Sequence, residues 1–145
     1  MMFKGIDHIG IVVRDITSAL PLFQEGMGLK LLGIEVIAED NVKVASLAIG
    51  ESRIELIEPI KEGTPVFRFL EKRGEGVHHI ALRVEDAKEA IGRLKEAGLK
   101  PVEGRSQTGA MGMEVAFIHP RSCHGVLMEV CEELKPRGKR EDGHL

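Results

Sequence analysis

The sequence has few aromatic residues and no long apolar run. Its 145 residues include five phenylalanines but no tryptophan and no tyrosine, so a site that stacks nucleobases on aromatic side chains is not expected. No stretch approaches the roughly 18 apolar residues of a membrane span, and no signal-peptide pattern follows Met1. The two cysteines, Cys123 and Cys131, are too few for a disulfide framework and indicate ordinary thiols in a cytoplasmic protein.

A strong excess of charge of one sign is also absent. Lys and Arg number 20 against 23 Asp and Glu, which gives a net charge of −3, and basic residues cluster only near the end of the chain. We therefore expect neither nucleic acid nor a membrane surface as a partner. At this length one domain buries about two thirds of its unfolded surface. We predict a single domain over residues 1–134 and a mobile tail over residues 135–145.

An internal repeat organises the predicted domain. Residues 7–15 match residues 78–86 at a constant shift of 71 residues, and the identical positions include His8 and His79. Such agreement predicts one supersecondary unit used twice. We expect the two copies to cover residues 5–60 and 76–131.

Each copy is predicted to form a strand, a helix and three further strands. Pro21 would kink or shorten the helix of the first copy, and a short helix over residues 64–73, capped by Thr64 and stopped by Gly74, joins the copies. The fold class is α+β: two tandem βαβββ modules form a curved mixed sheet with the helices on its outer face. The principal segments are helices over 16–27 and 87–97 and strands over 5–13, 42–49, 53–57, 77–84, 114–118 and 125–130.

Side-chain alternation along these strands gathers four ligand-type residues on the inner face. His8, Glu55, His79 and Glu129 each oppose an aliphatic row that can pack on a helix. A single histidine or glutamate on a strand is more often structural or solvated. Their equivalent placing in both copies instead favours one site for a divalent cation such as Co²⁺, Zn²⁺, Ni²⁺, Mn²⁺ or Fe²⁺.

The other histidines have weaker support as functional groups. His78 precedes a ligand residue, so we expect it on the opposite face in a structural or surface role. His119 lies in a His-Pro turn, where it either donates to a substrate anion or caps the turn. The loop over residues 109–112 lacks the lysine of a phosphate-cradling loop, so a nucleoside triphosphate site is not expected.

Four segments resemble a known group of enzymes. Residues 7–13, 54–59, 76–81 and 119–129 are similar to the vicinal oxygen chelate superfamily and, within it, to the methylmalonyl-CoA epimerase family. The His-Pro turn that leads into Gly-Val-Leu-Met-Glu is the most diagnostic segment. The resemblance implies interconversion of the (2R) and (2S) forms of methylmalonyl-CoA by movement of the proton on C2. It also implies one divalent metal, with Co²⁺ expected, an acyl-CoA substrate and a homodimer.

The resemblance also implies roles for individual residues. Glu129 is the expected catalytic base and doubles as a metal ligand. Several family members carry a second glutamate base on the strand before the Glu55 strand, but Val44 stands at that position here. The remaining alternatives for this base are Ser46, Glu35, Glu39 and a metal-bound water.

Three other functions remain open at this point. A glyoxalase I-type lactoylglutathione lyase uses the same four ligand types on a glutathione hemithioacetal. A metal-free binding protein of the same fold would have to bury four unpaired polar residues, which costs several kcal/mol. An extradiol dioxygenase is disfavoured by Glu55 as a fourth ligand.

Overall fold

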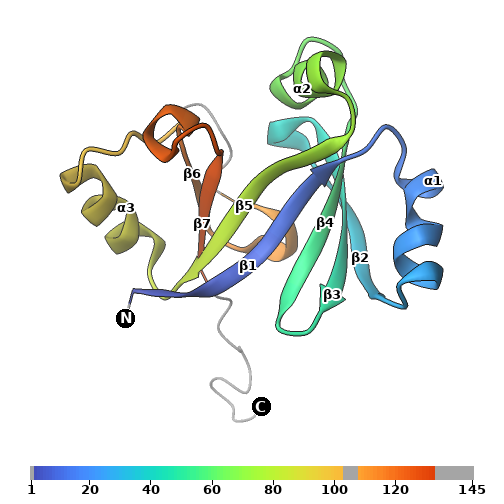
Figure 1. The fold of residues 1–145 in the computed structure, drawn as a ribbon, viewed down its shortest axis with the longest axis horizontal. Helices are drawn as coiled ribbons and strands as arrows, with labels where there is room; N and C mark the ends of the chain where they lie inside the picture. Colours follow the sequence, from blue (N-terminus) through green and yellow to red (C-terminus); the bar gives the residue numbers. More distant parts are fainter. Residues whose placement is uncertain (1, 103–107, 133–145) are drawn as a thin grey trace.

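Seven strands form one mixed sheet in the order β2-β3-β4-β1-β5-β7-β6. The structure is a computed structural model that describes residues 2–102 and 108–132 (Figure 1). The predicted curved mixed sheet is confirmed, whereas the predicted tail lies outside the described residues. The strands are β1 (Phe3–Val12), β2 (Lys30–Ile37), β3 (Val42–Ile49), β4 (Ser52–Pro59), β5 (Gly76–Val84), β6 (Val115–Ile118) and β7 (Met128–Glu132).

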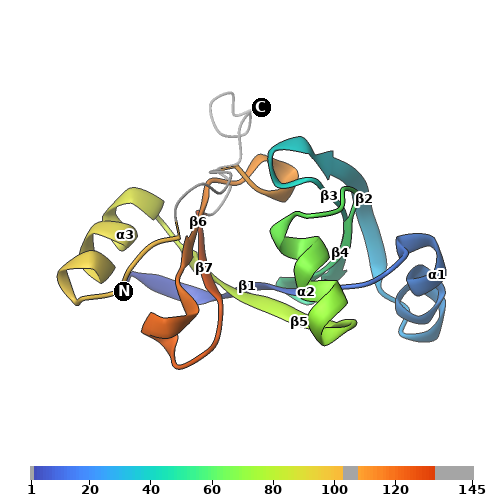
Figure 2. The same cartoon turned by 90° about the horizontal axis from the view of Figure 1, so that it is seen from above.

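The first strands of the two repeats lie side by side at the centre of the sheet. β1 pairs antiparallel with β5 and parallel with β4, and β5 pairs parallel with β7. Seen from above, the sheet is a U with β1 and β5 at its base, and the strands of each repeat rise on one arm (Figure 2). Residues of the two repeats therefore face each other across the interior of the U.

Among the described residues, the second repeat has one strand fewer than the predicted βαβββ unit. Among the described residues it contributes β5, β6 and β7 but no counterpart of β2. Only isolated bridges, from Pro101 to Ile118 and from Thr108 to Glu114, occur on either side of residues 103–107.

The helices follow the capping signals of the sequence. Asp86 Oδ1 accepts a hydrogen bond from the Glu89 amide at 3.0 Å and caps α3. The predicted helix over residues 16–27 is divided, because Pro21 has no amide hydrogen to continue the helical pattern, and a π-helical turn follows it. The bounds are α1 (Ile16–Pro21), the π-helical turn (Leu22–Gly26), α2 (Pro65–Arg73) and α3 (Ala87–Glu96), with 3₁₀ turns at Ala38–Asp40, Ala110–Gly112 and Pro120–Cys123.

Two of the three helices cover the outer face of the sheet, as predicted. Ile16 of α1 packs in one outer cluster, and Ala87 of α3 packs in another (Figure 1). α2 is the exception, because Val66 packs with Val12 and Val44 on the inner face. α2 therefore forms part of the wall of the interior space. Among the described residues, no helix has the length and apolar composition needed to cross a membrane.

Candidate active site

The four predicted ligand residues converge inside the U. His8 Nε2 lies 3.1 Å from His79 Nε2, 3.1 Å from Glu129 Oε1 and 3.4 Å from Glu55 Oε1. His79 Nε2 lies 4.0 Å from Glu129 Oε1. Each of the four residues is at most 5% exposed. Two imidazoles and two carboxylates from β1, β4, β5 and β7 thus form one buried cluster.

The spacing of these atoms fits a single bound cation. Two ligand atoms that each lie about 2.1 Å from one metal are about 3.0–3.4 Å apart in octahedral or tetrahedral coordination. His8, His79 and Glu129 offer ligand atoms that all lie within 4.8 Å of one another, and Glu55 approaches His8. Glu129 Oε1 is buried and accepts no hydrogen bond from the described residues. An orphaned carboxylate oxygen between two imidazoles is the donor set that a divalent cation would complete.

Gly10 allows the two histidines to approach. A Cβ atom at this position would lie 2.3 Å from His79 Cε1, far inside van der Waals contact. Because Gly10 is paired with His79 across β1 and β5, the imidazole of His79 lies over the glycine. The imidazole of His79 therefore fills the space that a side chain at position 10 would need.

Two bulges bring further polar residues to the inner face. The register of β1 and β5 shifts between Ile6 and His8 and again between Gly10 and Ile11. The first shift makes Asp7 an extra residue on β1, and the second does the same for His78 on β5. Asp7 Oδ2 lies 2.7 Å from His8 Nδ1, and His78 Nδ1 lies 2.9 Å from His79 Nδ1. The prediction that His78 faces away from His79 is therefore wrong, because strict alternation fails at a bulge.

Asp7 is the centre of a buried ionic network. Its carboxylate accepts hydrogen bonds from Arg53 Nη2 at 2.7 Å and from Arg83 Nε at 3.3 Å, besides its contact with His8. Burial opposes ionisation of Asp7, but the hydrogen bonds from His8 and Arg53 outweigh it and hold the pKa of its carboxyl well below the usual range.

The same contact controls the protonation of His8. Burial disfavours its imidazolium, but the hydrogen bond to Asp7, together with Glu129 and Glu55, raises the pKa of His8 to about 12 when no metal is bound. With Nδ1 directed at Asp7, Nε2 is the nitrogen that faces the cluster. A carboxylate behind a ligand histidine is a common way to orient that histidine and increase its basicity.

The two ligand glutamates have different surroundings. Glu55 Oε2 accepts a hydrogen bond from Arg53 Nη1 at 2.8 Å, so one of its oxygens is already held. Glu129 Oε1 lies 3.1 Å from His8 Nε2 but accepts no hydrogen bond from the described residues, and burial raises the pKa of the Glu129 carboxyl. The equivalent carboxylates of the two repeats are thus restrained to different degrees.

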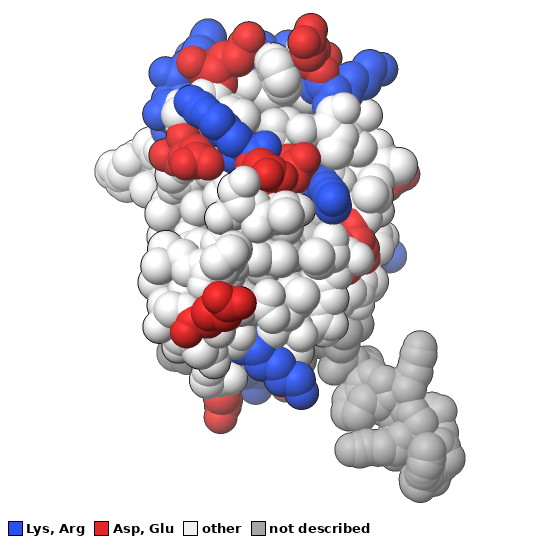
Figure 3. Space-filling view, turned by 90° about the vertical axis from the view of Figure 1, so that its right-hand side faces the viewer, with Lys and Arg blue, Asp and Glu red and all other residues white. Residues whose placement is uncertain are grey.

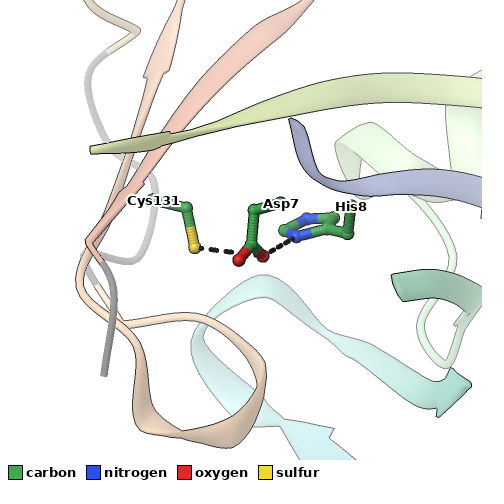
Figure 4. A group of neighbouring side chains, drawn as sticks. All are labelled: Asp7, His8 and Cys131. Carbon is green, nitrogen blue, oxygen red and sulfur yellow. Dashed lines mark hydrogen bonds and ion pairs between the residues drawn. The ribbon is translucent and has the colours of Figure 1, made fainter. Parts of the chain in front are cut away.

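Cys131 lies in the same network but is not suited to bind the metal. Its thiol is buried and contacts Asp7 Oδ2 at 3.5 Å, so Asp7 lies between Cys131 and His8 (Figure 4). Burial raises the pKa of Cys131 to about 12, and only a thiolate binds metals well. Asp7, Cys131 and His8 form a second group of potential ligands, but the guanidinium groups of Arg53 and Arg83 already occupy the Asp7 carboxylate.

A cavity of about 40 Å³ lies against the cluster. Val42, Val44 and Ile57 form part of an apolar wall, and the half-buried Asp40 lines the cavity as well. Val44 therefore faces the cavity at the position where the resemblance leads one to expect a base. Asp40 was not selected from the sequence.

The three residues considered as the second base lie away from the cavity. Ser46 Oγ accepts a hydrogen bond from Arg53 Nη1 at 3.4 Å. Glu35 is exposed, and its Oε2 accepts a hydrogen bond from the Met111 amide. Glu39 is also exposed. None of these three residues lines the cavity.

His119 caps its own turn. Its Nδ1 accepts a hydrogen bond from the Arg121 amide at 3.1 Å, and the residue is exposed outside the cavity. Of the two roles expected for His119, the structure shows a contact for the turn cap. Contact between His119 and a substrate anion stays a prediction.

Comparison with known proteins places this geometry in a family. Residues 7–117 match the Glyoxalase/Bleomycin resistance protein/Dioxygenase superfamily. The chain is 34% identical to the ethylmalonyl-CoA/methylmalonyl-CoA epimerase of Cereibacter sphaeroides, over 89% of this chain and 98% of that protein. It is also similar to a hypothetical protein from Bacillus halodurans, with 47% identity and a TM-score of 0.86 over 92% of this chain and 96% of the other.

Several solved structures of similar proteins contain a ligand. A Streptomyces coelicolor methylmalonyl-CoA epimerase variant in complex with 2-nitronate-propionyl-CoA has 34% identity and a TM-score of 0.86, over 90% of this chain and 98% of that chain. The chain therefore belongs to the Glyoxalase/Bleomycin resistance protein/Dioxygenase superfamily and is similar over nearly its whole length to methylmalonyl-CoA epimerases of that superfamily.

Proposed function

We propose that this protein is a metal-dependent isomerase that interconverts the (2R) and (2S) forms of methylmalonyl-CoA. The observation that carries the proposal is the orphaned, buried carboxylate of Glu129 within a cluster that also offers His8 and His79. The similarity to methylmalonyl-CoA epimerases supports the choice of substrate. The buried cluster of two carboxylates and two imidazoles disfavours a metal-free binding protein, because buried charged groups that are not fully hydrogen-bonded are costly.

His8, Glu55, His79 and Glu129 are the proposed metal ligands. A mixed set of imidazole and carboxylate donors suits Co²⁺, our proposed metal, and also Zn²⁺, Ni²⁺ or Mn²⁺. A divalent cation bound there would supply electrostatic stabilisation for negative charge that develops on the thioester oxygen. The remaining chemistry is the removal and return of the proton on C2, which requires protein bases.

Glu129 is the proposed base on one face of C2. Its buried Oε1 accepts no hydrogen bond from the described residues, and the raised pKa of its carboxyl makes it a better proton acceptor than an exposed glutamate. Glu55 is less suited, because its carboxylate accepts a hydrogen bond from Arg53. Glu129 would take the C2 proton and hold it at a carboxylate oxygen.

Asp40 is the proposed group on the opposite face. Among the described residues, the carboxylates that line the cavity are Asp40, Glu55 and Glu129. Asp40 follows β2 and Glu129 lies on β7, so the two carboxylates come from opposite arms of the U. Asp40 would return a proton to the face opposite the one from which Glu129 removed it, and exchange with water would restore both groups.

A homodimer in the cytoplasm is part of the same proposal. β2 is an edge strand, and its Leu32, Ile34 and Val36 are exposed. The side of the molecule that carries α1 and β2 shows a broad area without Lys, Arg, Asp or Glu (Figure 3). An exposed apolar edge supports association with a second copy. Light scattering coupled to gel filtration would test the dimer, and a monomeric mass would contradict it.

Proton NMR of methylmalonyl-CoA in D₂O tests the reaction directly. The purified protein is expected to exchange the C2 hydrogen, to lose this activity after treatment with a chelator and to regain it with Co²⁺. Absence of exchange together with turnover of a glutathione hemithioacetal would overturn the proposal in favour of a glyoxalase I-type lyase.

A further inference from the structure

The two bulges between β1 and β5 occupy equivalent positions in the two repeats. The pairing of these strands skips Asp7 on β1 and His78 on β5. The two skipped residues are related by the same shift of 71 residues as the repeats, and each directly precedes a histidine of the cluster. A bulge re-aims the side chain of its extra residue. In both repeats, this extra side chain lies beside a proposed ligand imidazole.

Both bulged residues contact the same atom of the following histidine. Asp7 Oδ2 lies 2.7 Å from Nδ1 of His8, and His78 Nδ1 lies 2.9 Å from Nδ1 of His79. In each histidine Nε2 is the nitrogen that faces the cluster. The two partners differ in their chemistry, because a carboxylate only accepts a hydrogen bond, whereas an imidazole nitrogen either donates or accepts.

The position of Nε2 determines the direction of the hydrogen bond between the two adjacent histidines. A neutral imidazole has one nitrogen with a proton and one with a free lone pair, and a cation binds the lone pair. Nε2 of His79 lies 3.1 Å from His8 Nε2 and 4.0 Å from Glu129 Oε1, where a cation would bind. The proton of His79 then belongs on Nδ1, which donates to Nδ1 of His78.

The packing of both rings supports this contact. The half-buried ring of His78 meets Phe69 of α2 edge to face, with centroids 5.0 Å apart and planes at 75°. The ring of His79 packs edge to face against His8 and Phe117, with centroids 5.2 Å apart in each case. Such packing fixes where the rings lie. A hydrogen bond, in contrast, fixes which ring nitrogen carries the proton.

We propose that His78 is a positioning residue of the metal site, which accepts the Nδ1 proton of His79 and thereby keeps Nε2 of His79 available for the cation. The inference rests on the metal site of the proposed function. His78 has in the second repeat the role that Asp7 has in the first, but it is an uncharged acceptor. It therefore orients His79 without adding negative charge to a cluster that already contains Asp7, Glu55 and Glu129.

Two substitutions separate the hydrogen bond of His78 from its packing. His78→Asn keeps an acceptor, because Oδ1 of asparagine can take the place of Nδ1, but it loses the ring against Phe69. His78→Leu keeps apolar bulk against Phe69 but has no acceptor. Titration with Co²⁺ followed by visible absorption measures the metal affinity of each variant.

The affinity for Co²⁺ is expected to fall about tenfold or more in the His78→Leu variant and to stay within about threefold of wild type in the His78→Asn variant. An unchanged affinity in the His78→Leu variant would overturn the inference. Equal losses in both variants would also overturn it, because the loss would then follow the packing of the ring and not its acceptor.

The protonated nitrogen of His79 can be observed without metal or substrate. At about pH 8, above the ordinary pKa of histidine, long-range ¹H–¹⁵N correlation spectra of the wild-type protein are expected to show His79 with its proton on Nδ1. The His78→Leu variant is expected to lose this preference. The signals of His79 are identified by their absence from the spectrum of the His79→Ala variant.

A wild-type His79 that carries its proton on Nε2 would contradict the inference. The spectrum decides this point even if the protein exchanges no C2 hydrogen of methylmalonyl-CoA, a result that would contradict the proposed function instead.

Discussion

At the scale of single residues, the clearest prediction concerns the proposed base Glu129. Glu129→Gln removes a base while keeping the size of the side chain, so we expect the rate of C2 exchange to fall by about 10³-fold or more. The NMR assay in D₂O measures the rate. Glu114→Gln, a change of an exposed carboxylate next to β6, is the control and is expected to retain exchange. Substantial exchange in the Glu129→Gln variant would contradict the assignment of this residue.

The environment of His8 predicts how metal affinity depends on pH. With its pKa raised to about 12, His8 carries a proton at neutral pH when no metal is bound. Because a histidine binds a metal only as the neutral imidazole, metal binding releases this proton. The logarithm of the apparent affinity for Co²⁺ is therefore expected to rise by about one per pH unit between about pH 6.5 and 8.5.

Visible absorption of bound Co²⁺ provides the measurement of this slope. Asp7→Asn is the control, because loss of the carboxylate brings the pKa of His8 back toward its ordinary value and flattens the slope above about pH 7. A pH-independent affinity in the wild-type protein would contradict a charged His8.

The same raised pKa affects the stability of the metal-free protein. A folded-state pKa above the unfolded value stabilises the fold fully below about pH 6.5, and this contribution is lost as the pH rises toward the folded value of about 12. The metal-free fold is therefore least supported by His8 at alkaline pH, where metal binding is strongest.

At the scale of elements, alternation along β-strands predicted the four residues that cluster, which are the proposed ligands, but not the residues that support them. His8, Glu55, His79 and Glu129 follow from regular strands, and the structure brings all four together. Asp7 could not be found in this way, because it reaches the inner face only through a bulge. Bulges depend on pairing between two distant strands and leave no clear local signal in one sequence.

One supporting residue that the sequence analysis missed, Arg53, could have been found from the alternation of side chains along its strand. Arg53 is two positions before Glu55 on β4, so alternation already places both on the same face. The early end of α1 at Pro21 agrees with the sequence analysis, which expected this proline to kink or shorten the helix. Asp40, by contrast, had no periodic signal in the sequence, because it lies in a 3₁₀ turn between β2 and β3. Its place beside the cavity depends on the folding of the whole chain.

The close approach of β1 and β5 leads to a prediction for Gly10. Gly10→Ala would place a Cβ atom 2.3 Å from His79 Cε1, so the imidazole has to move and Co²⁺ affinity is expected to fall at least about tenfold. Titration followed by visible absorption measures the change. Gly33→Ala on β2 is the control, because no atom lies within 4 Å of its added Cβ. Equal Co²⁺ affinities in the Gly10→Ala and wild-type proteins would contradict the proposed role of His79.

At the scale of the whole molecule, the metal site joins the two repeats. β1 and β4 of the first repeat and β5 and β7 of the second each provide one proposed ligand. A cation that binds only the folded protein stabilises it by about 2.7 kcal/mol when its concentration is 100 times the Kd. For a chain of this size, we expect Co²⁺ at that excess to raise Tm by roughly 5–10 °C relative to the metal-free protein.

Thermal unfolding with and without a chelator measures this shift. His79→Ala removes a proposed ligand, so its Tm should respond little to Co²⁺, and recovery of the shift by the variant would argue for a different site. The exposed His124 lies outside the cluster, and His124→Ala is expected to keep the full response.

The unequal support of Glu55 and Glu129 has a consequence for how such proteins diversify. The first repeat holds its imidazole with Asp7 and its carboxylate with Arg53, whereas Glu129 Oε1 of the second repeat accepts no hydrogen bond from the described residues. The two repeats thus support their equivalent proposed ligands to different degrees. Under the proposed function, a change at Glu129 alone could alter the proton transfer while His8, Glu55 and His79 still hold the cation, so a new activity would not require a new metal site.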